Sequence, residues 1–480
     1  MPNRASPVPR KSSRVLARNN IAHQPVPIPP LPTLLVISQV YVPDPASVGQ
    51  HMADAAETMV ARGFRVLVLA SARGYENPSV RYPRAERRGG VDVVRLPLSS
   101  FGKRSLPLRL LGQGLFLLQV IMRGLFVRRM AGILVSRSPP MASFAALAIS
   151  LVRGVPITYW LMDLNPDQAA SLGKTSARSP FTRAMRWLNR RIYARAREVV
   201  VLDRFMIDRI ERQYPVRGRI TVLPPWPHDE ALADVGPGSN PFRAEHNPQE
   251  RFVVMYSGNH SLASPITTLL EAALWLRQDP RFLFMFIGGG LGKREVDEAI
   301  AIQRPANIVS LPYQPLERIQ FSLSAADLHV VTLGNDMPGI IHPCKIYGAM
   351  AVGRPILLIG PRRSHAGDLI DRFHVGWQVD QGDVATTIAV LEQVASMAAD
   401  KRDAIGARGR TVVRERFAKS RLCAEFCDVV ERSMAAAPAR EDALVVPAAN
   451  SAAAATGALG PLSSFESLPP DPAVAAEVAT

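Results

Sequence analysis

Short apolar segments alternate with helical ones along most of this chain, and that alternation limits the fold more than any other feature. Residues 34–38 form an apolar strand segment, residues 50–62 a helical one that stops at Gly63, and residues 66–70 the next strand segment. Parallel strands that follow each other in sequence need a long crossover, which is usually a helix. The pattern therefore predicts an α/β fold, with parallel sheets that helices cover on both faces.

The alternation occurs in two series, with a proline-containing break at residues 224–250. The first series continues with strand segments at 157–161, 199–203 and 220–223, and the second has strand segments at 252–257, 282–287, 308–311, 328–332, 356–359 and 377–379. A chain of 480 residues is long enough for two such domains. We predict a Rossmann-like domain at 32–223, a linker at 224–250 and a second Rossmann-like domain at 251–435. We expect the terminal helical segment of the second domain to cross back onto the first.

The two ends of the chain differ in composition from the rest. Residues 1–31 carry five basic residues and no acid, whereas alanine, proline and serine dominate residues 436–480. Such segments bury too little apolar surface to fold, so we predict that both are disordered, the first as a basic arm. The first 31 residues also lack the apolar core of a secretory signal, so we expect a cytoplasmic protein.

The chain is strongly basic. Lysine and arginine number 57 against 41 acidic residues, which gives a formal charge of +16. Such a charge attracts nucleic acid, an anionic membrane or an anionic substrate. Because no basic motif is interleaved with aromatic residues, a nucleic-acid-binding protein is a remote alternative and we expect no nucleic-acid partner. The three cysteines have no metal-ligand spacing, so we predict no metal site and reduced thiols.

The segment 339–361 is the strongest candidate for a chemical site. It predicts a loop, a short helix that starts near Pro343 and stops at Gly353, and a buried strand. A helix start presents unpaired backbone N–H groups and the positive end of the helix dipole, and Lys345 adds a full charge in the first turn. These groups would bind an anion. An ordinary strand-helix-strand connection with a solvated lysine explains the pattern equally well.

Residues 343–355 resemble the donor-site segment of family 4 glycosyltransferases of the two-domain GT-B type, in particular those that build bacterial exopolysaccharide and O-antigen. The segments 256–259, 311–315 and 325–327 are similar to further landmarks of that family, and the resemblance spans residues 33–433. It implies two Rossmann-like domains that face each other across a cleft. It also implies a nucleotide diphosphate sugar as co-substrate, retention of the anomeric configuration, and neither a cofactor nor a metal ion.

The resemblance also implies roles for single residues. Gly258, in a turn, would let the backbone approach the diphosphate, and Lys345 would neutralise the phosphates as a catalytic residue. The remaining donor-binding positions are Gly49 opposite the diphosphate, Asn259 in the same turn as Gly258, His260 at the phosphates, Tyr313 and Gln314 at the nucleobase, and Asp336, Gly339, His342 and Gly348 in or next to the donor segment. The family's pair of glutamates falls on Ile340 and Gly348, which are not acidic, and Asp336 or His342 could replace the first glutamate.

Asp163 follows the strand segment at 157–161, and open α/β sheets bind their ligands at the carboxyl ends of strands. In the resemblance this segment lines the cleft near the acceptor, where Asp163 would be catalytic by orienting the acceptor hydroxyl. Helix capping by Asp163 or Asp167 is an equal alternative.

Residues 106–127 are almost entirely apolar but include Arg109 and Arg123. An arginine near the centre of a membrane span costs roughly 2.5 kcal/mol or more, which disfavours a transmembrane helix. An amphipathic helix at the surface of the anionic inner membrane fits better, with both arginines at the lipid phosphates. A core helix of the first domain is an equal alternative.

These observations together predict an enzyme of the hexosyltransferase type. It would move a sugar from a nucleotide diphosphate sugar to a lipid-linked or polysaccharide acceptor in bacterial surface-polysaccharide synthesis, attached peripherally to the inner membrane. A sugar-nucleotide epimerase or a non-catalytic partner with the GT-B fold is the main alternative, because the two glutamates are missing.

Overall fold

The computed structural model describes residues 31–435 except 45, 75–78, 100–105, 140, 174, 177, 215, 217, 228–231 and 233. The two predicted disordered ends therefore lie outside the described residues, apart from Leu31. In the described part of the chain, the residues form two parallel sheets covered by helices.

The first sheet has eight strands in the order β3-β4-β2-β1-β5-β6-β7-β8. They are β1 (Thr33–Ile37), β2 (Arg65–Ser71), β3 (Ala85–Arg88), β4 (Val91–Leu96), β5 (Met130–Ser136), β6 (Ile157–Trp160), β7 (Glu198–Val201) and β8 (Ile220–Val222). All neighbours pair in parallel except the edge strand β3, which is antiparallel to β4. Strand β1 lies between β2 and β5 and is buried along its whole length, as expected for a strand covered on both faces.

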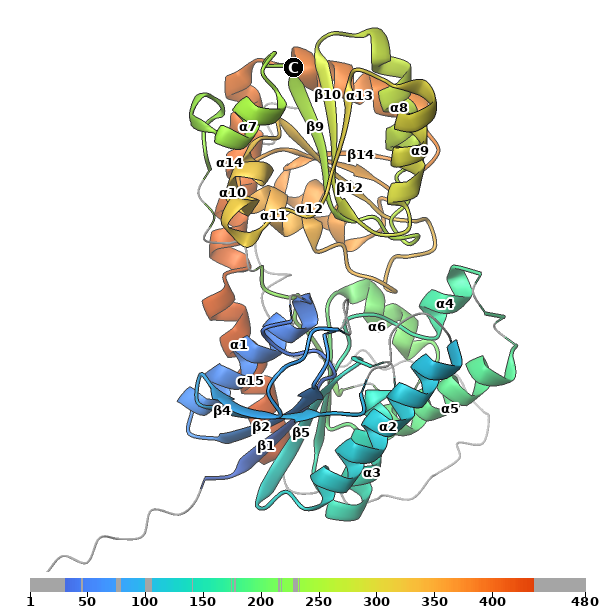
Figure 1. Cartoon of the computed structure of the whole chain (residues 1–480), viewed down its shortest axis with the longest axis vertical. Coiled ribbons are helices and arrows are strands. Elements are labelled where there is room, and N and C mark those ends of the chain that lie inside the picture. Colours follow the sequence, from blue (N-terminus) through green and yellow to red (C-terminus); the bar gives the residue numbers. More distant parts are fainter. Residues whose placement is uncertain are drawn as a thin grey trace, which may run out of the picture. The chain divides into compact units, whose positions relative to one another are not determined.

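Helices cover both faces of this sheet. They are α1 (Ser47–Ala61), α2 (Leu106–Leu125), α3 (Ala142–Arg153), α4 (Asp167–Ser171), α5 (Pro180–Arg195) and α6 (Arg204–Glu211). Figure 1 shows α2, α3 and α5 on one side of the first sheet, and α1 on the other side together with the last helix of the chain, α15 (Lys419–Ala435).

The second sheet has six strands, all parallel, in the order β11-β10-β9-β12-β13-β14. They are β9 (Phe252–Asn259), β10 (Phe282–Gly289), β11 (Ile308–Leu311), β12 (Leu328–Thr332), β13 (Ile356–Ile359) and β14 (Gly376–Val379), so each predicted strand of this series is present. Helices α8 (Thr267–Trp275), α9 (Lys293–Gln303) and α13 (Val384–Ser396) cover one side, and α10 (Leu316–Ser324), α11 (Lys345–Ala351), α12 (His365–Phe373) and α14 (Ala399–Arg416) cover the other (Figure 1).

Alternate residues of the central strands enter different cores. Tyr256 and Phe284 pack in a cluster with residues of α8 and α13, whereas Met255 and Leu283 pack against Phe242 on the opposite face. Successive side chains of a strand point to opposite faces, so a continuous apolar run fills both cores.

Part of the predicted linker is folded. Helix α7 (Pro241–His246) lies within it, with the side chain of Asn240 accepting hydrogen bonds from the backbone N–H groups of Phe242 and Arg243 as its N-cap. Arg243 forms an ion pair of 2.9 Å with Asp327 beside the second sheet. Residues 240–247 thus belong structurally to the second sheet, because the buried ring of Phe242 is part of its core.

The last helix, α15, packs on the first sheet. The ring of Phe426 lies 4.4 Å from that of Trp160 in β6, and the Cys427 thiol contacts the carbonyl oxygen of Ala55 in α1. At its first residue, Lys419 forms an ion pair of 2.7 Å with Asp54. The first sheet is therefore completed by residues from the end of the described chain.

Candidate active site

The carboxyl ends of β9 and β10 meet at two glycines. Gly258 pairs with Gly288, and both have φ values of +126°, which side chains other than glycine rarely allow. A Cβ atom on Gly288 would lie 2.1 Å from the Gly258 oxygen. The predicted turn at Gly258 is therefore wrong: β9 continues through Asn259, because two glycines allow the strands to stay paired, and the chain turns only after His260.

Lys345 lies at this glycine pair. It is the first residue of α11, and its Nζ donates a hydrogen bond of 2.9 Å to the carbonyl oxygen of Asn259 and lies 4.9 Å from the centre of the Tyr256 ring. A Cβ atom on Gly258 would be 2.7 Å from Cε of Lys345. The structure thus brings together Gly258, Asn259 and Lys345, three residues that the sequence assigned to donor binding.

His260 is a neutral side chain whose Nδ1–H group already has an acceptor. Its side chain is buried, and its Nδ1 lies 3.0 Å from the Gly258 carbonyl oxygen, which implies that Nδ1 carries the proton. Burial, with the charges of Lys293 and Lys345, lowers the pKa of His260 to about 4. The imidazole is neutral near pH 7, and its Nε2 has no hydrogen-bond partner among the described residues. The predicted phosphate contact of this side chain therefore has no support in the geometry.

Tyr313 and Gln314 follow the end of β11. The Tyr313 ring lies against the backbone of Gly289, and its side chain is 59% exposed, which leaves a face open for a nucleobase. Gln314 is half-buried, and its side chain donates a hydrogen bond to the carbonyl oxygen of Pro312. Tyr313 therefore lies at the same sheet edge as Asn259, because Gly289 pairs with Asn259.

Four predicted donor residues lie in or before α11 but have different surroundings. Asp336 is exposed, and its carbonyl oxygen accepts a hydrogen bond from Arg209. Gly339 has φ +70°, and a Cβ atom there would lie 2.2 Å from the Phe205 oxygen of α6, so this glycine allows the loop to approach that helix. Gly348 is buried inside α11, and the His342 side chain is buried and occupied by other contacts.

Gly49 also differs from its prediction. It was expected in the loop after β1, but it lies in the first turn of α1, which begins at Ser47, and it is buried. A Cβ atom on Gly49 would lie 3.2 Å from the backbone of Tyr41, so the residue allows helix and loop to pack closely.

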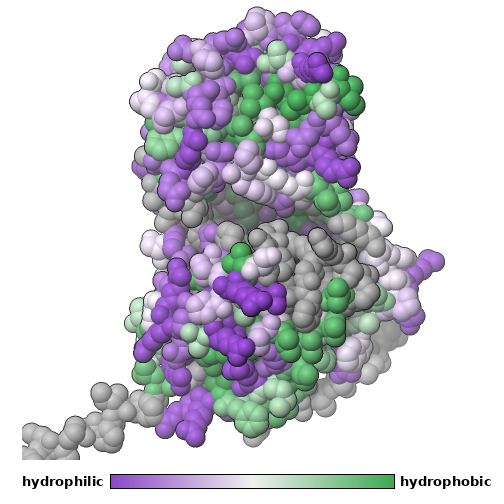
Figure 2. Space-filling view, viewed as in Figure 1, coloured by the Kyte–Doolittle hydropathy of each residue, from purple (hydrophilic) through white to green (hydrophobic). Residues whose placement is uncertain are grey.

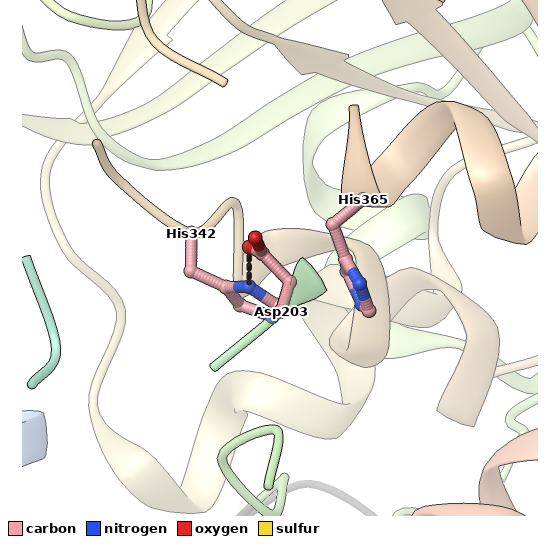
Figure 3. Close-up of side chains that lie close together, drawn as sticks. All are labelled: Asp203, His342 and His365. Carbon is pink, nitrogen blue, oxygen red and sulfur yellow. Dashed lines mark hydrogen bonds and ion pairs between the residues drawn. The ribbon is translucent and has the colours of Figure 1, made fainter. Parts of the chain in front are cut away.

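A hydrogen-bonded series of four buried side chains links the connecting segments of the two sheets, and Figure 3 shows three of them, Asp203, His342 and His365. Asp203 Oδ2 accepts a bond of 2.9 Å from Nδ1 of His342, and the Tyr347 hydroxyl lies 2.9 Å from Nε2 of both His342 and His365. The other Asp203 oxygen accepts a bond of 3.0 Å from the Met206 N–H and so caps α6. A single carboxylate thus holds a helix of the first sheet and a loop of the second.

The two ends of this hydrogen-bonded series, Asp203 and His365, each keep one protonation state near neutral pH. Burial acts to raise the pKa of Asp203, but the hydrogen bond and charge of His342 outweigh it, so the pKa ends below its usual value. Burial and the neighbouring His342 lower the pKa of His365 to about 3. Near neutral pH, Asp203 is therefore ionised and His365 neutral.

Asp203, His342 and His365 could also hold a metal ion, since each offers a ligand atom and these atoms lie within 4.8 Å of one another. Two histidines and a carboxylate suit Zn²⁺. However, the Tyr347 hydroxyl bridges the two histidines, and a metal ion would have to replace these hydrogen bonds. The types of residue suit a metal ion, but the existing hydrogen bonds do not. That the protein binds no metal ion stays a prediction.

Asp163 lies beside the donor loop. It follows β6 and forms an antiparallel bridge with Ile341, and the N–H of Leu164 donates a bond of 2.9 Å to the carbonyl oxygen of Ile340. The half-buried carboxylate is 3.7 Å from the Arg137 guanidinium, and partial burial raises its pKa despite that charge. It caps no helix, because Pro166 occupies the N-cap of α4.

Helix α2 combines the two alternatives weighed for residues 106–127. Phe116 and Val120 are buried in the first core, whereas the other face exposes Leu111, Leu118 and Met122. Arg123 is exposed, and the side chain of Arg109 lies outside the described residues. Figure 2 shows hydrophobic surface over α2 and α3, and further exposed apolar side chains occur on α3 and α5: Phe144, Leu151, Val152, Phe181 and Trp187. Among the described residues, no helix is long and apolar enough to cross a membrane.

Two sheets of mostly parallel strands, each covered by helices, with a candidate site on their connecting segments, are the architecture of the GT-B fold class. The sucrose-phosphate synthase from Thermosynechococcus elongatus has a TM-score of 0.66 at 14% identity, with 84% of this chain and 98% of that chain covered. Anabaena Alr3699/HepE, solved in complex with UDP and glucose, gives 0.63 at 15% identity, with 83% and 99% covered. At these identities, the likeness establishes the fold.

Comparisons of sequence add to the likeness of fold. Residues 47–226 match the model of the glycosyl transferase 4-like domain. The chain is 23% identical to the probable glycosyltransferase WbjE of Pseudomonas aeruginosa. The match covers 54% of this chain and only 63% of WbjE. It is also 23% identical to the putative colanic acid biosynthesis glycosyl transferase WcaI of Escherichia coli (strain K12), over 71% of this chain and 86% of WcaI. The predicted resemblance to family 4 glycosyltransferases and the predicted GT-B fold are confirmed.

Proposed function

We propose that this protein is a glycosyltransferase of the hexosyltransferase type that acts in bacterial surface-polysaccharide synthesis. It would move a sugar from a nucleotide diphosphate sugar to a lipid-linked or polysaccharide acceptor. One observation carries the proposal. Lys345 lies at the Gly258–Gly288 pair, and the exposed ring of Tyr313 lies against the next residue of β10, Gly289. The printed name of WcaI, a putative colanic acid biosynthesis glycosyl transferase, supports the biosynthetic context.

We expect the donor site to need no metal ion or cofactor. The leaving nucleotide diphosphate gains negative charge as the glycosidic bond breaks, and a fixed cation stabilises that charge more in the transition state than in the ground state. Lys345 supplies the cation, and the lack of a side chain at Gly258 leaves room for the Lys345 side chain at the strand end. The Tyr313 ring would stack on the base.

On the acceptor side, Asp163 is the candidate for orienting the hydroxyl. The bridge between Asp163 and Ile341 places it beside the loop that precedes α11. Its raised pKa makes the carboxylate a better hydrogen-bond acceptor for a hydroxyl than an ordinary aspartate. We infer retention of the anomeric configuration from the family alone.

Peripheral attachment to the anionic inner membrane, on the cytoplasmic side, is part of the proposal. The exposed apolar face of α2 provides Leu111, Leu118 and Met122, and Arg123 on the same helix is exposed. Apolar side chains next to basic ones are the combination that binds an anionic lipid surface.

A sugar-nucleotide epimerase or a non-catalytic partner is the second candidate, and one observation favours it. Ile340 and Gly348 occupy the positions of the family's glutamates, and neither has a carboxylate. Both residues are buried. An epimerase would convert the donor without an acceptor, whereas a non-catalytic partner would leave it unchanged.

The test begins with a thermal-shift screen of the full chain against UDP-, GDP- and ADP-sugars. The nucleotide sugar that stabilises the protein is then radiolabelled and incubated with membrane lipids from a polysaccharide-producing bacterium. We expect label to appear in the lipid fraction with wild type and to fall sharply with Lys345→Ala and Asp163→Asn. Donor conversion without lipid labelling would favour the epimerase, and stabilisation by none of the nucleotide sugars would overturn the proposal.

A further inference from the structure

A cleft of about 250 Å³ lies against α6, outside the donor residues described above. It is lined by Phe205, Asp208, Arg209, Arg212, Pro338 and Arg363. A cavity needs only about 10–15 Å³ of water-accessible space to hold one water molecule. The cleft is therefore large enough for a small charged group.

The lining of this cleft is cationic. Three guanidinium groups face one carboxylate, that of Asp208. Arg209 is fixed in place, because its Nε donates to the Pro338 oxygen at 2.6 Å and its Nη2 to the Asp336 oxygen at 2.8 Å. Arg212 and Arg363 are exposed, and the described part of the chain offers neither of them a hydrogen bond or ion pair. The cleft thus holds two positive charges that no described group of the protein pairs with.

The cleft also lies where α/β sheets bind ligands. Helix α6 follows the carboxyl end of β7, and Arg363 follows the carboxyl end of β13. Ligands of open α/β sheets bind outside these ends. Segments that follow strands of both sheets therefore contribute cations to one small space, with Arg209 in the last turn of α6 and Arg212 at its C-cap.

Arg209 connects the cleft to the acceptor side. It also lines a second cavity, of about 10 Å³, together with Asn165 and Asp167 from the segment that begins at Asp163. On the other side, Pro338 directly precedes Gly339 of the donor loop. The cleft thus borders both the acceptor segment and the donor loop without including Gly258 or Lys345.

We propose that this cleft binds a phosphate or diphosphate group carried by the acceptor, with Arg209, Arg212 and Arg363 as its ligands. Guanidinium groups bind phosphate oxygens with paired N–H donors, and the net charge of +2 from three arginines and Asp208 balances the two charges of a diphosphate ester. This inference rests on the proposed function, and it narrows the acceptor to a lipid phosphate or diphosphate. A neutral polysaccharide end would leave the arginines unpaired.

The first measurement uses inorganic pyrophosphate, titrated calorimetrically into the full chain in the presence of saturating UDP, which occupies a donor site. The test variant is Arg212→Gln with Arg363→Gln. The matched control is Arg183→Gln with Arg190→Gln, two exposed arginines of α5 with the same change in charge. We expect the test variant to bind pyrophosphate about tenfold or more weakly, and the control to bind like wild type. Thermal denaturation of each variant checks that it is folded.

The second measurement identifies the source of the phosphate. Geranyl diphosphate should bind wild type with the same dependence on Arg212 and Arg363, and geraniol should not. Equal weakening in test and control variants, or no pyrophosphate binding by wild type, would overturn the cleft. A matching loss of UDP affinity in the test variant would assign the arginines to the donor instead and would also overturn it. A wild type that binds pyrophosphate through Arg212 and Arg363 but binds no nucleotide would overturn the proposed transferase and leave the anion site standing.

Discussion

Replacing Asp203 by alanine should destabilise the protein by about 2–4 kcal/mol. Two contacts are lost at once: the N-cap of α6, which accounts for about 1 kcal/mol, and the acceptor of the buried His342 Nδ1–H, which costs about 1–3 kcal/mol when left unpaired. Both His342 and Asp203 are almost fully buried, so water cannot replace the lost partner.

Asp203→Asn should cost much less, about 1 kcal/mol, because the four-residue chain can reverse its direction. The asparagine oxygen can keep the cap, and its amide can donate to Nδ1 of the other His342 tautomer. Nε2–H of His342 then donates to the Tyr347 oxygen, and the Tyr347 hydroxyl donates to His365. Each bond is kept with its proton moved to the other partner, and the 2.9 Å distances allow either direction.

Urea denaturation followed by far-UV circular dichroism measures both variants. Asp383→Ala is the matched control, because Asp383 caps α13 in the same way but is exposed and bonds no histidine. We expect the order of stability to be wild type, Asp203→Asn, then Asp203→Ala, with the control losing its cap and an exposed hydrogen bond from the Thr386 hydroxyl. Equal losses for the two Asp203 variants would refute the reversible chain, and a loss for Asp203→Ala no larger than that of the control would refute the whole argument.

Four further predictions follow from other features. Burial lowers the pKa of His329 to about 4 and that of His365 to about 3, against about 6.5 in the unfolded chain, so the unfolded chain binds more protons in acid. The free energy of unfolding should therefore fall by roughly 1.6 kcal/mol for each histidine between pH 6.5 and about pH 5. A urea midpoint that stays constant over that range would contradict this prediction. Lys345→Ala should weaken binding of the nucleotide sugar by about 1–3 kcal/mol in calorimetry, and unchanged affinity would place the anion site elsewhere. Transfer activity should survive EDTA, and loss of activity that Mn²⁺ restores would show the metal-free prediction to be wrong. Binding to anionic vesicles should decrease but persist as the salt concentration rises. The double variant Arg109→Glu with Arg123→Glu should be released from the vesicles while it stays folded, because each basic group near the surface adds about 1 kcal/mol to binding. If the wild type does not bind vesicles at low salt, α2 belongs to the core alone.

Most strands that are buried on both faces could be predicted from sequence, although β4 and the largely buried β5 were not. The apolar runs of β1, β9 and β10 predicted their positions to within a residue or two. Strand β3 was missed because Glu86, Arg87 and Arg88 leave it polar and it lies at the sheet edge. An edge strand depends on its neighbour rather than on its own apolar surface.

The candidate site was predictable only where it depends on the end of one strand or the start of one helix. Lys345 and Gly258 are of this kind. The Asp203–His342 bond joins residues 139 positions apart and depends on two sheets coming into contact, which no local pattern reports. The low pKa of His260 was hidden for a similar reason, since it arises from burial and from Lys293 and Lys345.

The return of α15 to the first sheet has a consequence for the order in which the protein is made. Trp160 and Trp226 pack against Phe426, so the ribosome must add some 200 residues after Trp226 before their partner exists. During that time, the N-terminal half has an uncovered apolar face while the second sheet is being synthesised. A chain stopped before Lys419 should therefore need a chaperone, and a separately produced α15 peptide should rescue its solubility.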